Sequence, residues 1–267
     1  MIRLTGSSNP VIKEVRSLKN RSAREKKGIF FIEGSRFVAE ALKESADILY
    51  IIMSDTFLAG HGKEELADMI EKSSIRCYEV PESLFGSISD TQTPQGILAV
   101  LRLQKKALDE AVLGNGMLVV MDMVKDPGNM GTIIRTADAA GCAGVIVTDG
   151  CVDVFNPKVL RSTMGSIFHI PVYHCGNVEE ALMKVKESGF LVCASHLEGT
   201  VDIFDVDLTG NVALVVGSEA EGISGTAARN ADLLVRIPML GRAESLNVSV
   251  AAGIMMFEAV RRKRECS

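Results

Sequence analysis

Two polar side chains, Asn129 and Arg135, lie in a pattern that predicts a strand, a turn and a helix. The apolar run 117–121 is typical of a buried strand, and Pro127-Gly128 forces a turn after it. Asn129 then stands where a helix N-cap is expected, and apolar residues recur after it at helical spacing. Arg135 falls off this apolar stripe, so we expect its guanidinium to face a cleft or solvent. Such a helix start is a common ligand-binding arrangement, and an ordinary βα unit with a surface arginine is the alternative.

Two later stretches have a similar pattern. Residues 214–224 begin with an apolar run, which predicts a buried strand. They continue into a polar loop bounded by Gly217 and Gly222, with Glu219 between them. Residues 237–253 contain a short strand, a loop and a helix start that carries Ser245 and Asn247. The chain thus offers carboxylate, amide, hydroxyl and guanidinium groups after three successive buried segments.

Together the three stretches resemble the three motifs of the SpoU (TrmH-like) family of SPOUT RNA 2'-O-ribose methyltransferases, over roughly residues 117–262. Carried over by position, the resemblance implies a catalytic set formed by Asn129, Arg135, Glu219, Ser245 and Asn247. One residue departs from the family pattern, because Ser218 stands where Asn is common. We do not expect this departure to abolish activity.

The resemblance implies S-adenosylmethionine as the cofactor, held in a bent form mainly by backbone groups. No Gly-x-Gly-x-x-Gly follows a strand in this sequence, so a dinucleotide-type cofactor site is unsupported. By position, Gly217, Ile237 and Leu246 would line the cofactor pocket, with Met239 as a neighbour. A glycine admits close approach of the backbone, and the three apolar side chains would form a bed for adenine. Simple core packing is the alternative for these residues.

The family assigns the catalytic act to the arginine at position 135. A guanidinium stays protonated in nearly every environment, so it is a poor general base. We therefore favour a role for Arg135 in holding an RNA phosphate and stabilising the developing alkoxide, while a phosphate-assisted or basic Arg135 stays open. Asn129, Glu219, Ser245 and Asn247 would fix the nucleotide and the arginine by hydrogen bonds. A helix-cap role is the alternative for Ser245 and Asn247, and His169 is expected to be structural.

The fold class that follows is α/β, with a C-terminal SPOUT domain over residues 117–267, a linker over 106–116 and a smaller α/β domain over 1–105. Alternating strands and helices in the second half predict a mostly parallel sheet covered on both faces. A trefoil knot and a two-fold dimer are implied by the resemblance alone. The last helix, expected over 248–262, is apolar nearly all round, so we expect it at or near a homodimer interface.

In the first hundred residues we expect an α/β unit. Helices are predicted over 9–19, from 34 to about 42 and over 63–71, and strands over 28–33, 48–53, 76–80 and 97–101. The stretch Phe30–Gly34, which is followed by a predicted helix, and the later stretch Thr93–Ile97 resemble parts of the family's N-terminal substrate-binding domain. That domain has the fold of ribosomal protein L30e.

The chain has 267 residues and a net charge of −5, which argues against a generic nucleic-acid binder. Its first 27 residues nevertheless carry eight Lys and Arg side chains against two Glu. A local basic segment of this kind is typical of a phosphate-binding surface, and solvated charges on an amphipathic helix are the alternative. The side chains that we expect to bind RNA are Arg16, Lys19, Arg21 and Arg24.

Six scattered cysteines show no C-x-x-C pair and no spacing typical of a metal site, so we expect free thiols, no metal and a cytoplasmic protein. No apolar run reaches the length of a membrane span, and the N-terminus lacks the apolar core of a signal peptide.

The sequence therefore predicts an S-adenosylmethionine-dependent RNA 2'-O-ribose methyltransferase. The L30e-like resemblance favours 23S ribosomal RNA over transfer RNA as the substrate. Two other classes stay open, which are an RNA-binding member of the fold that has lost activity and a small-molecule nucleotide-binding α/β protein.

Overall fold

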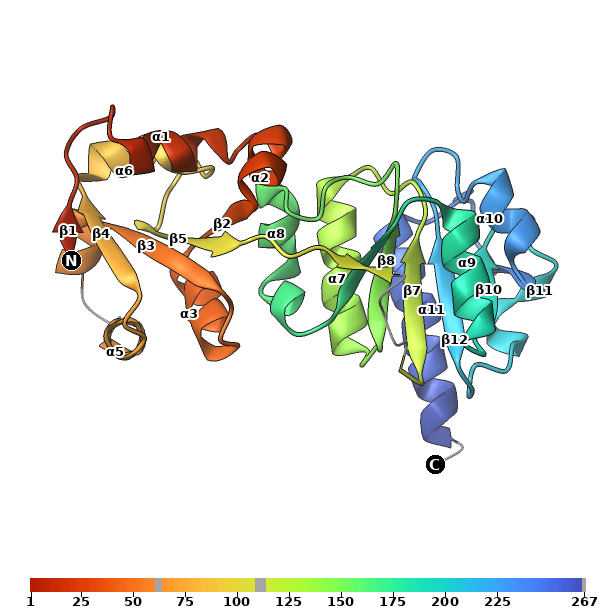
Figure 1. The fold of residues 1–267 in the computed structure, drawn as a ribbon. Coiled ribbons are helices and arrows are strands. Elements are labelled where there is room, and N and C mark those ends of the chain that lie inside the picture. Colours follow the sequence, from red (N-terminus) through yellow and green to blue (C-terminus); the bar gives the residue numbers. More distant parts are fainter. Residues whose placement is uncertain (61–63, 109–113, 266–267) are drawn as a thin grey trace. The chain divides into compact units, whose positions relative to one another are not determined.

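The computed structural model describes residues 1–60, 64–108 and 114–265, and its chain divides into two compact units (Figure 1). The N-terminal unit comprises residues 1–104 together with 155–168, and the C-terminal unit comprises 105–154 and 169–267. Aromatic contacts show why residues 155–168 group with the N-terminal residues. The Phe155 ring lies 4.9 Å from that of Phe30, and the Phe168 ring lies 5.6 Å from that of Phe37. The expected boundaries, 1–105 and 117–267, did not separate this segment from the catalytic half.

The N-terminal unit is built on a five-stranded mixed sheet in the order β1-β4-β3-β5-β2. Its strands are β1 (Ile2–Arg3), β2 (Ile29–Glu33), β3 (Ile48–Ser54), β4 (Arg76–Val80) and β5 (Ile97–Arg102). Its helices are α1 (Pro10–Ser17), α2 (Arg21–Lys27), α3 (Ser35–Lys43), α4 (Asp55–Ala59), α5 (Glu64–Lys72), α6 (Glu82–Ile88) and α8 (Pro157–Thr163), followed by the 3₁₀ turn η2 (Ser166–Phe168).

Local sequence signals explain where α1 and α2 begin and end. The side chain of Asn9 accepts a hydrogen bond from the Val11 amide, and Pro10 occupies the first turn, where no amide donor is needed. Gly28 ends α2 in the left-handed region at φ 64°, which a glycine adopts without steric cost. The buried side chains of α1, Ile12 and Val15, belong to one core cluster with residues of α6 and of the sheet.

The C-terminal unit is built on an eight-stranded sheet in the order β11-β13-β10-β12-β7-β8-β9-β6. Its strands are β6 (Lys106–Ala107), β7 (Met117–Met121), β8 (Gly144–Thr148), β9 (Val172–Cys175), β10 (Leu191–Ser195), β11 (Val201–Asp202), β12 (Val212–Val216) and β13 (Leu233–Arg236). Its helices are α7 (Pro127–Ala139), α9 (Val178–Glu187), α10 (Gly225–Asn230) and α11 (Val248–Glu265), with the 3₁₀ turn η3 (Ile203–Asp205).

Every pair of neighbouring strands in this sheet is parallel, as the alternation of strands and helices predicted. Leu118 and Val120 of β7 pack into one core cluster with Ala181 and Leu182 of α9. Successive side chains of a strand point to opposite faces, so Val119 faces the other layer, in which α7 and α11 pack together. The sheet is therefore covered on both faces, which explains why its central strands are buried throughout.

The structure differs from the sequence expectations mainly in short elements. The patterns did not indicate β1, β6, β11, α2, α4, α6 or α10, each of seven residues or fewer. Ile237 lies one residue past β13 and not within a strand. The expected linker 106–116 begins with β6 and continues into residues 109–113, which lie outside the described residues. The trefoil knot implied by the resemblance stays a prediction.

The five described cysteines are free, and Cys266 lies outside the described residues. Burial raises the pKa of Cys142 and of Cys193 to about 12, so both thiols are protonated at neutral pH. Neither of these two thiols is therefore suited to act as a nucleophile. Among the described helices, none has the length and apolar character that crossing a membrane requires.

Candidate active site at the carboxyl edge of the parallel sheet

The three polar stretches leave the parallel sheet at the same edge. β7 ends at Met121, β12 at Val216 and β13 at Arg236, and all three strands run in the same direction. β7 and β12 are direct neighbours, while β10 separates β12 from β13. Ligands of parallel α/β sheets bind outside the carboxyl ends of the strands. The topology thus brings the three motifs, which are far apart in the sequence, to one candidate site.

A chain of hydrogen bonds joins one residue from each stretch. The side-chain amide of Asn129 donates to Oε1 of Glu219 at 2.5 Å, and Nδ2 of Asn247 donates to Oδ1 of Asn129 at 3.0 Å. Both Glu219 and Asn247 are exposed, so the chain of bonds faces solvent. Asn129 uses its amide as donor and acceptor at once, and this fixes the orientation of its side chain. The structure brings these three predicted residues together.

The helix caps differ in part from the prediction. Asp126, not Asn129, caps α7, because its Oδ1 accepts a hydrogen bond from the Asn129 amide at 2.8 Å. The side chain of Asn129 is thereby left available for Glu219 and Asn247. Asn247 does cap α11, since its Oδ1 accepts from the Ser249 amide at 2.9 Å. Its Oδ1 therefore caps the helix while its Nδ2 bonds to Asn129, and its role in fixing the nucleotide stays a prediction.

Arg135 and Ser245 lie apart from this hydrogen-bond chain. Arg135 is exposed on α7, six residues after Asn129, which corresponds to about 9 Å along a helix axis. Within the described part of the chain, its guanidinium forms no hydrogen bond or ion pair. Ser245 is exposed in the loop before α11, and its side chain likewise has no hydrogen-bond partner among the described residues. Both side chains are therefore free to contact a substrate.

The loop after β12 is tightly closed on itself. The Ser218 amide donates to the Gly222 carbonyl at 2.8 Å, and the Gly222 amide donates to the Ser218 carbonyl at 3.0 Å. A Cβ atom at Gly217 would overlap the backbone of Gly222 and Ile223, so only glycine fits there. The hydroxyl of Ser218 accepts from the Glu221 amide at 3.0 Å. The serine that departs from the family pattern thus stabilises the turn that carries Glu219.

The predicted cofactor residues are placed at the same edge. Gly217 is buried, whereas Ile237, Met239 and Leu246 are half-buried in the irregular segment between β13 and α11. Half-buried apolar side chains suit a nucleoside, which needs an apolar bed and a few hydrogen bonds. Leu240, in the same segment, is 99% exposed.

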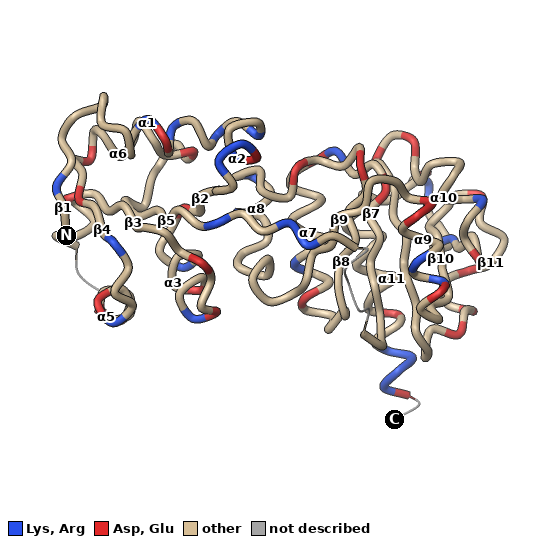
Figure 2. The backbone as a smooth tube through the Cα atoms, in the orientation of Figure 1, with Lys and Arg blue, Asp and Glu red and all other residues tan. Residues whose placement is uncertain are grey.

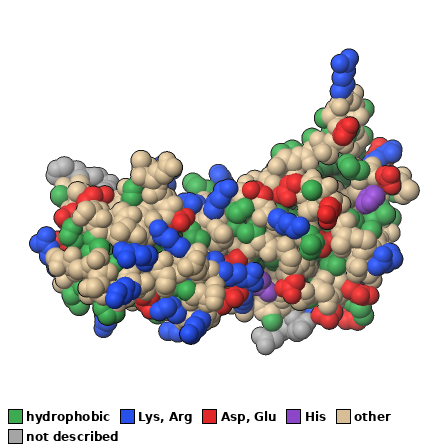
Figure 3. All heavy atoms as spheres, turned by 90° about the horizontal axis from the view of Figure 1, so that it is seen from above, with side chains coloured by type: hydrophobic (Ala, Val, Ile, Leu, Met, Phe, Trp, Pro, Cys, Tyr) green, Lys and Arg blue, Asp and Glu red, His purple; other side chains and the backbone are tan. Residues whose placement is uncertain are grey.

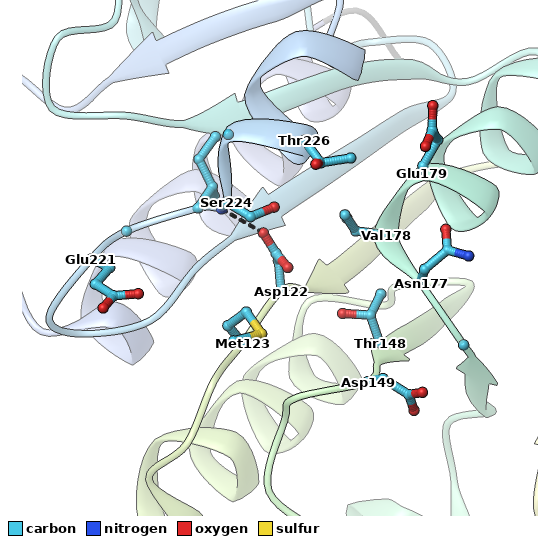
Figure 4. Close-up of a pocket in the computed structure, with 14 residues that line it drawn as sticks. Asp122, Met123, Thr148, Asp149, Asn177, Val178, Glu179, Glu221, Ser224 and Thr226 are labelled. Atoms are coloured by element: carbon cyan, nitrogen blue, oxygen red, sulfur yellow. Dashed lines mark hydrogen bonds between the residues drawn. The ribbon is translucent and has the colours of Figure 1, made fainter.

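A cavity of about 580 Å³ opens at this edge, but none of the four predicted cofactor residues lines it. Its lining comes from the ends of β7 and β8, the start of α9 and the loop before α10 (Figure 4). Asp122, which is 2% exposed, accepts a hydrogen bond from the Ser224 amide at 2.7 Å. Asp149, Glu179 and Glu221 add further carboxylates, and no lysine or arginine lines the cavity. This charge disfavours binding of an RNA phosphate in the cavity.

Sequence reasoning missed two residues that shape the edge. Asp122 ties the end of β7 to the start of α10, and its position directly after a buried strand was the available signal. Gly199 follows β10, and a Cβ atom there would lie 2.7 Å from the carbonyl carbon of Val235 in β13. Nothing in the sequence around Gly199 distinguished it from an ordinary loop glycine.

One of the four predicted RNA-binding residues is corrected by the structure. Arg24 is 2% exposed, and its Nη1 donates to the carbonyls of Leu18 at 2.7 Å and Lys19 at 3.0 Å. Its guanidinium is therefore a structural group that links α2 to the end of α1, and it cannot reach an RNA phosphate. The helical pattern of α2, which the sequence reasoning did not distinguish, turns this side chain inward.

The other three predicted residues lie nearer the surface of the N-terminal unit, where Lys and Arg positions recur along the backbone of α1 and α2 (Figure 2). Arg16 is exposed and donates to the Ser87 hydroxyl at 2.9 Å, and Lys19 is half-buried and donates to the Ser89 carbonyl at 2.5 Å. Arg21 is exposed and forms an ion pair with Glu25 at 3.1 Å. Lys13 and Lys26, which were not in the predicted set, are also exposed.

Comparison with known proteins bears on both halves of the chain. Residues 116–257 match the SpoU rRNA Methylase family, and residues 9–99 match the MRM3-like substrate binding domain. The chain is also 35% identical over 257 residues to the 23S rRNA (guanosine(2553)-2'-O)-methyltransferase RlmP of Bacillus subtilis, which covers 96% of this chain and 98% of that protein. The chain belongs to the SpoU rRNA methylase family.

Solved structures of SpoU-type enzymes have the same fold. The AdoMet-bound rRNA methyltransferase from Sinorhizobium meliloti superposes with a TM-score of 0.86 at 34% identity, covering 97% of each chain. The TrmH/SpoU tRNA modifying enzyme from A. aeolicus superposes with a TM-score of 0.51 at 33% identity, covering 57% of this chain and 78% of that one. The expected fold class, a SpoU domain preceded by a smaller α/β substrate-binding domain, is confirmed.

Proposed function

We propose that this SpoU-family chain is an S-adenosylmethionine-dependent methyltransferase that methylates a ribose 2'-hydroxyl in large-subunit ribosomal RNA. The observation that carries the proposal is the hydrogen-bond chain from Glu219 through Asn129 to Asn247. It joins all three motifs at the carboxyl edge of the sheet, with the exposed Arg135 on the same helix as Asn129. A structural role alone would not need three polar side chains bonded to one another at a solvent-facing edge.

The residues at this edge fit S-adenosylmethionine, whose sulfonium supplies an activated methyl group. Ile237, Met239 and Leu246 offer the half-buried apolar surface on which an adenine packs. Gly217 keeps the loop after β12 closed, so that its backbone groups stay in fixed positions. The name of the Sinorhizobium meliloti structure, an AdoMet-bound rRNA methyltransferase, supports the same cofactor.

Arg135 acts on the charge that develops on the ribose oxygen. The guanidinium stays protonated, so it stabilises the alkoxide that forms as the hydroxyl loses its proton, and it holds an adjacent RNA phosphate. Its exposure and its lack of a carboxylate partner in the described part of the chain leave this charge available. The hydrogen-bond chain around Asn129 and the hydroxyl of Ser245 position the ribose next to Arg135.

Ribosomal RNA is favoured over transfer RNA by what the relatives share with this chain. RlmP, named for 23S rRNA, matches nearly the whole chain, including the N-terminal unit. The A. aeolicus tRNA modifying enzyme matches 57% of the chain. The match to RlmP thus extends over residues 9–99, which match the substrate binding domain in this chain. Methylation of transfer RNA is the alternative, and an inactive RNA-binding member is the less favoured one.

Transfer of tritium from labelled S-adenosylmethionine to protein-free ribosomal RNA tests the proposal. We expect incorporation into the 23S RNA and none into transfer RNA. Mapping 2'-O-methyl groups in a deletion strain against its parent then identifies the nucleotide. Incorporation into transfer RNA alone would establish the alternative substrate. RNA binding without any incorporation would show that this chain is an inactive member of the family.

The exposed cations of α1 and α2 are proposed to supply the long-range attraction to RNA (Figure 3). Replacing Lys13, Arg16 and Lys26 by Gln should weaken binding to all RNAs alike and leave cofactor affinity unchanged. The slope of log affinity against log salt should become less negative by roughly 2 to 3, at about 0.7 to 0.9 per lost phosphate contact. Filter binding across a salt series measures this slope.

The matched control for this triple variant removes cations that are already paired. Lys72 and Arg102 form ion pairs with Asp68 at 2.6 Å and Asp47 at 3.0 Å, so their replacement by Gln should barely change the slope. An unchanged slope in the triple variant would mean that these three side chains do not contact RNA phosphates. Arg24 is excluded from this test, because its loss would disturb the fold.

We also propose that two copies of the chain pair through α11. Val250 and Phe257 are 49% and 50% exposed and lie seven residues apart, so they share one face of the helix. Exposed apolar side chains on one helix face, one of them aromatic, are typical of a surface covered by a second protein chain. The reducing compartment suggested by the free thiols would place this dimer in the cytoplasm.

Replacing Phe257 by Arg in the full chain should convert the dimer to a monomer at micromolar concentration, because a buried unpaired charge at an interface is costly. Light scattering of wild type and variant measures the mass. Met183→Arg is the matched control, since Met183 is 53% exposed on a different helix, α9, and should leave the mass unchanged. A monomeric wild type, or a dimeric Phe257→Arg variant, would remove α11 as the interface.

A further inference from the structure

A single buried carboxylate holds one loop of the N-terminal unit in place. Glu33, at the end of β2, is 9% exposed. Its Oε1 accepts from the Ser89 hydroxyl at 2.6 Å and from the Thr91 hydroxyl at 2.7 Å, and its Oε2 accepts from the Asp90 amide at 2.9 Å. Three consecutive residues of one loop are thus tied to one side chain. A buried carboxylate is tolerated only when its oxygens are satisfied in this way, so the loop has little freedom to move away.

The other end of the same loop, residues 89–96, is fixed as well. Oε1 of Gln95 accepts from the amide of Ser35 at 2.9 Å and from its hydroxyl at 3.0 Å. The Gly96 carbonyl accepts from the Ser54 amide at 2.8 Å, and Gly96 adopts φ +80°, a conformation that favours glycine. Between these two anchors, the side chains of Gln92 and Thr93 are exposed. The loop therefore presents an uncharged polar tip on a rigid base.

Three cations converge on the first half of this loop and on the residues that precede it. Arg16 donates to the Ser87 hydroxyl at 2.9 Å, and Lys19 donates to the Ser89 carbonyl at 2.5 Å. Arg161 of α8 forms an ion pair with Asp90 at 2.7 Å. Phe155 before Arg161 and Phe168 after it both pack their rings on the N-terminal unit, so α8 is an integral part of this unit.

This combination fits RNA with unpaired bases better than it fits other partners. Amide and hydroxyl side chains read the edges of unstacked bases by hydrogen bonds, and neighbouring cations contact the phosphates. A tip made of Gln92 and Thr93 offers no apolar surface for a membrane or for a hydrophobic peptide. Preorganisation matters here, because a loop held on fixed supports loses little entropy when it binds.

We infer that the loop Ser89–Gly96 contacts unpaired bases of the RNA substrate, and that Glu33 is the residue that positions this loop. The inference rests on the proposed function, since it assigns part of the specificity of that reaction to the N-terminal unit. The role inferred for the loop is recognition of bases, whereas the role proposed for Lys13, Arg16 and Lys26 is attraction of the phosphate charge.

The direct test replaces the exposed tip, where substitution cannot disturb a core. In the double variant Gln92→Ala/Thr93→Ala we expect the KM for protein-free 23S RNA to rise about 10-fold, the effect of losing two net hydrogen bonds. The kcat at saturating RNA and the affinity for S-adenosylmethionine should stay at wild-type values, because such binding is uniform over the reaction. The salt slope should also stay unchanged, since no phosphate contact is lost.

The matched control carries the same two changes at exposed positions elsewhere in the same unit, Thr5→Ala/Gln104→Ala, and should behave as wild type. Glu33→Ala should raise the KM for RNA at least as much as the tip variant, again without a change in kcat. Glu33→Gln should restore part of the loss, because its amide oxygen still accepts from the Ser89 and Thr91 hydroxyls while its NH₂ opposes the Asp90 amide.

The outcomes separate this inference from the function on which it rests. If wild-type protein transfers no methyl group to the RNA, the proposed function fails. If wild type is active and the tip variant keeps its KM, the loop does not contact RNA and the inference is overturned. A fall in kcat with an unchanged KM in Glu33→Ala would also overturn it, since Glu33 would then act on the catalytic step. An equal rise of the KM in the control variant would overturn it too, because the effect would then belong to the whole surface of the N-terminal unit and not to this loop.

Discussion

Arg135→Ala should lower the rate of methyl transfer by ~100–1,000-fold, the usual cost of removing one pre-placed transition-state group. The reason lies in its position on α7, where the guanidinium is exposed and has no partner among the described residues. The affinity for S-adenosylmethionine should stay nearly unchanged, because the half-buried apolar residues lie in a different segment. Single-turnover transfer of tritiated methyl groups at saturating RNA measures the rate, and calorimetric titration measures the cofactor affinity.

Two comparisons make this result specific. Arg229→Ala removes another arginine of the same unit, on α10, and should leave the rate unchanged. Leu246→Arg should show the reverse pattern, with cofactor affinity lost first, since it places a charge among apolar groups. If Arg135→Ala kept most of its rate on the true substrate, the electrostatic role assigned to this residue would be wrong.

Gly217→Ala should have the second large effect, on stability and cofactor affinity together. An added Cβ would overlap backbone atoms of Gly222 and Ile223, so the loop after β12 would have to open. Overpacking of this kind costs about 1–3 kcal/mol in the free energy of unfolding. The antiparallel bridge between Ser218 and Gly222 would be lost with it, and the backbone groups that we propose to hold the cofactor would move. We expect affinity for S-adenosylmethionine to fall more than ~10-fold.

Gly210→Ala is the matched control for this variant. A Cβ atom at Gly210 meets no heavy atom within 4 Å. The same chemical change there should therefore leave both the free energy of unfolding and the affinity for S-adenosylmethionine near wild type. Thermal unfolding and calorimetric titration report them separately. Wild-type cofactor affinity in a folded Gly217→Ala protein would show that the closed loop is not part of the cofactor site.

The sequence predicted the long elements of this protein well. Strand β7 was expected over 117–121 and is observed there, because five consecutive buried residues bounded by a turn leave few alternatives. Helix α11 was expected over 248–262 and is observed from Val248 to Glu265. The parallel arrangement followed from the alternation of strands and helices. In each case the local pattern and the tertiary environment favour the same structure.

Features that depend on distant partners were not predictable from local patterns. Asn129 was expected to cap α7, but Asp126 takes that role. Either side chain can accept a hydrogen bond from the first turn of a helix, so the sequence alone did not distinguish them. Arg24 looks like a surface cation in a basic segment, and only the folded unit shows that carbonyls of Leu18 and Lys19 surround it. The bond between Asn247 and Asn129 spans 118 residues, so the motifs suggested a shared site without giving its geometry.

The grouping of residues 155–168 with the N-terminal unit constrains how the protein is made on the ribosome. When residue 104 leaves the exit tunnel, the unit still lacks α8, and Phe30 and Phe37 lack the rings that they pack against. The unit therefore cannot cover these two rings until residue 168 has been synthesised, by which time β7, α7 and β8 already exist. Domains usually fold in order from the N-terminus during synthesis. Here the synthesis of the two units overlaps, and a chain truncated after residue 104 would leave the rings of Phe30 and Phe37 without these partners.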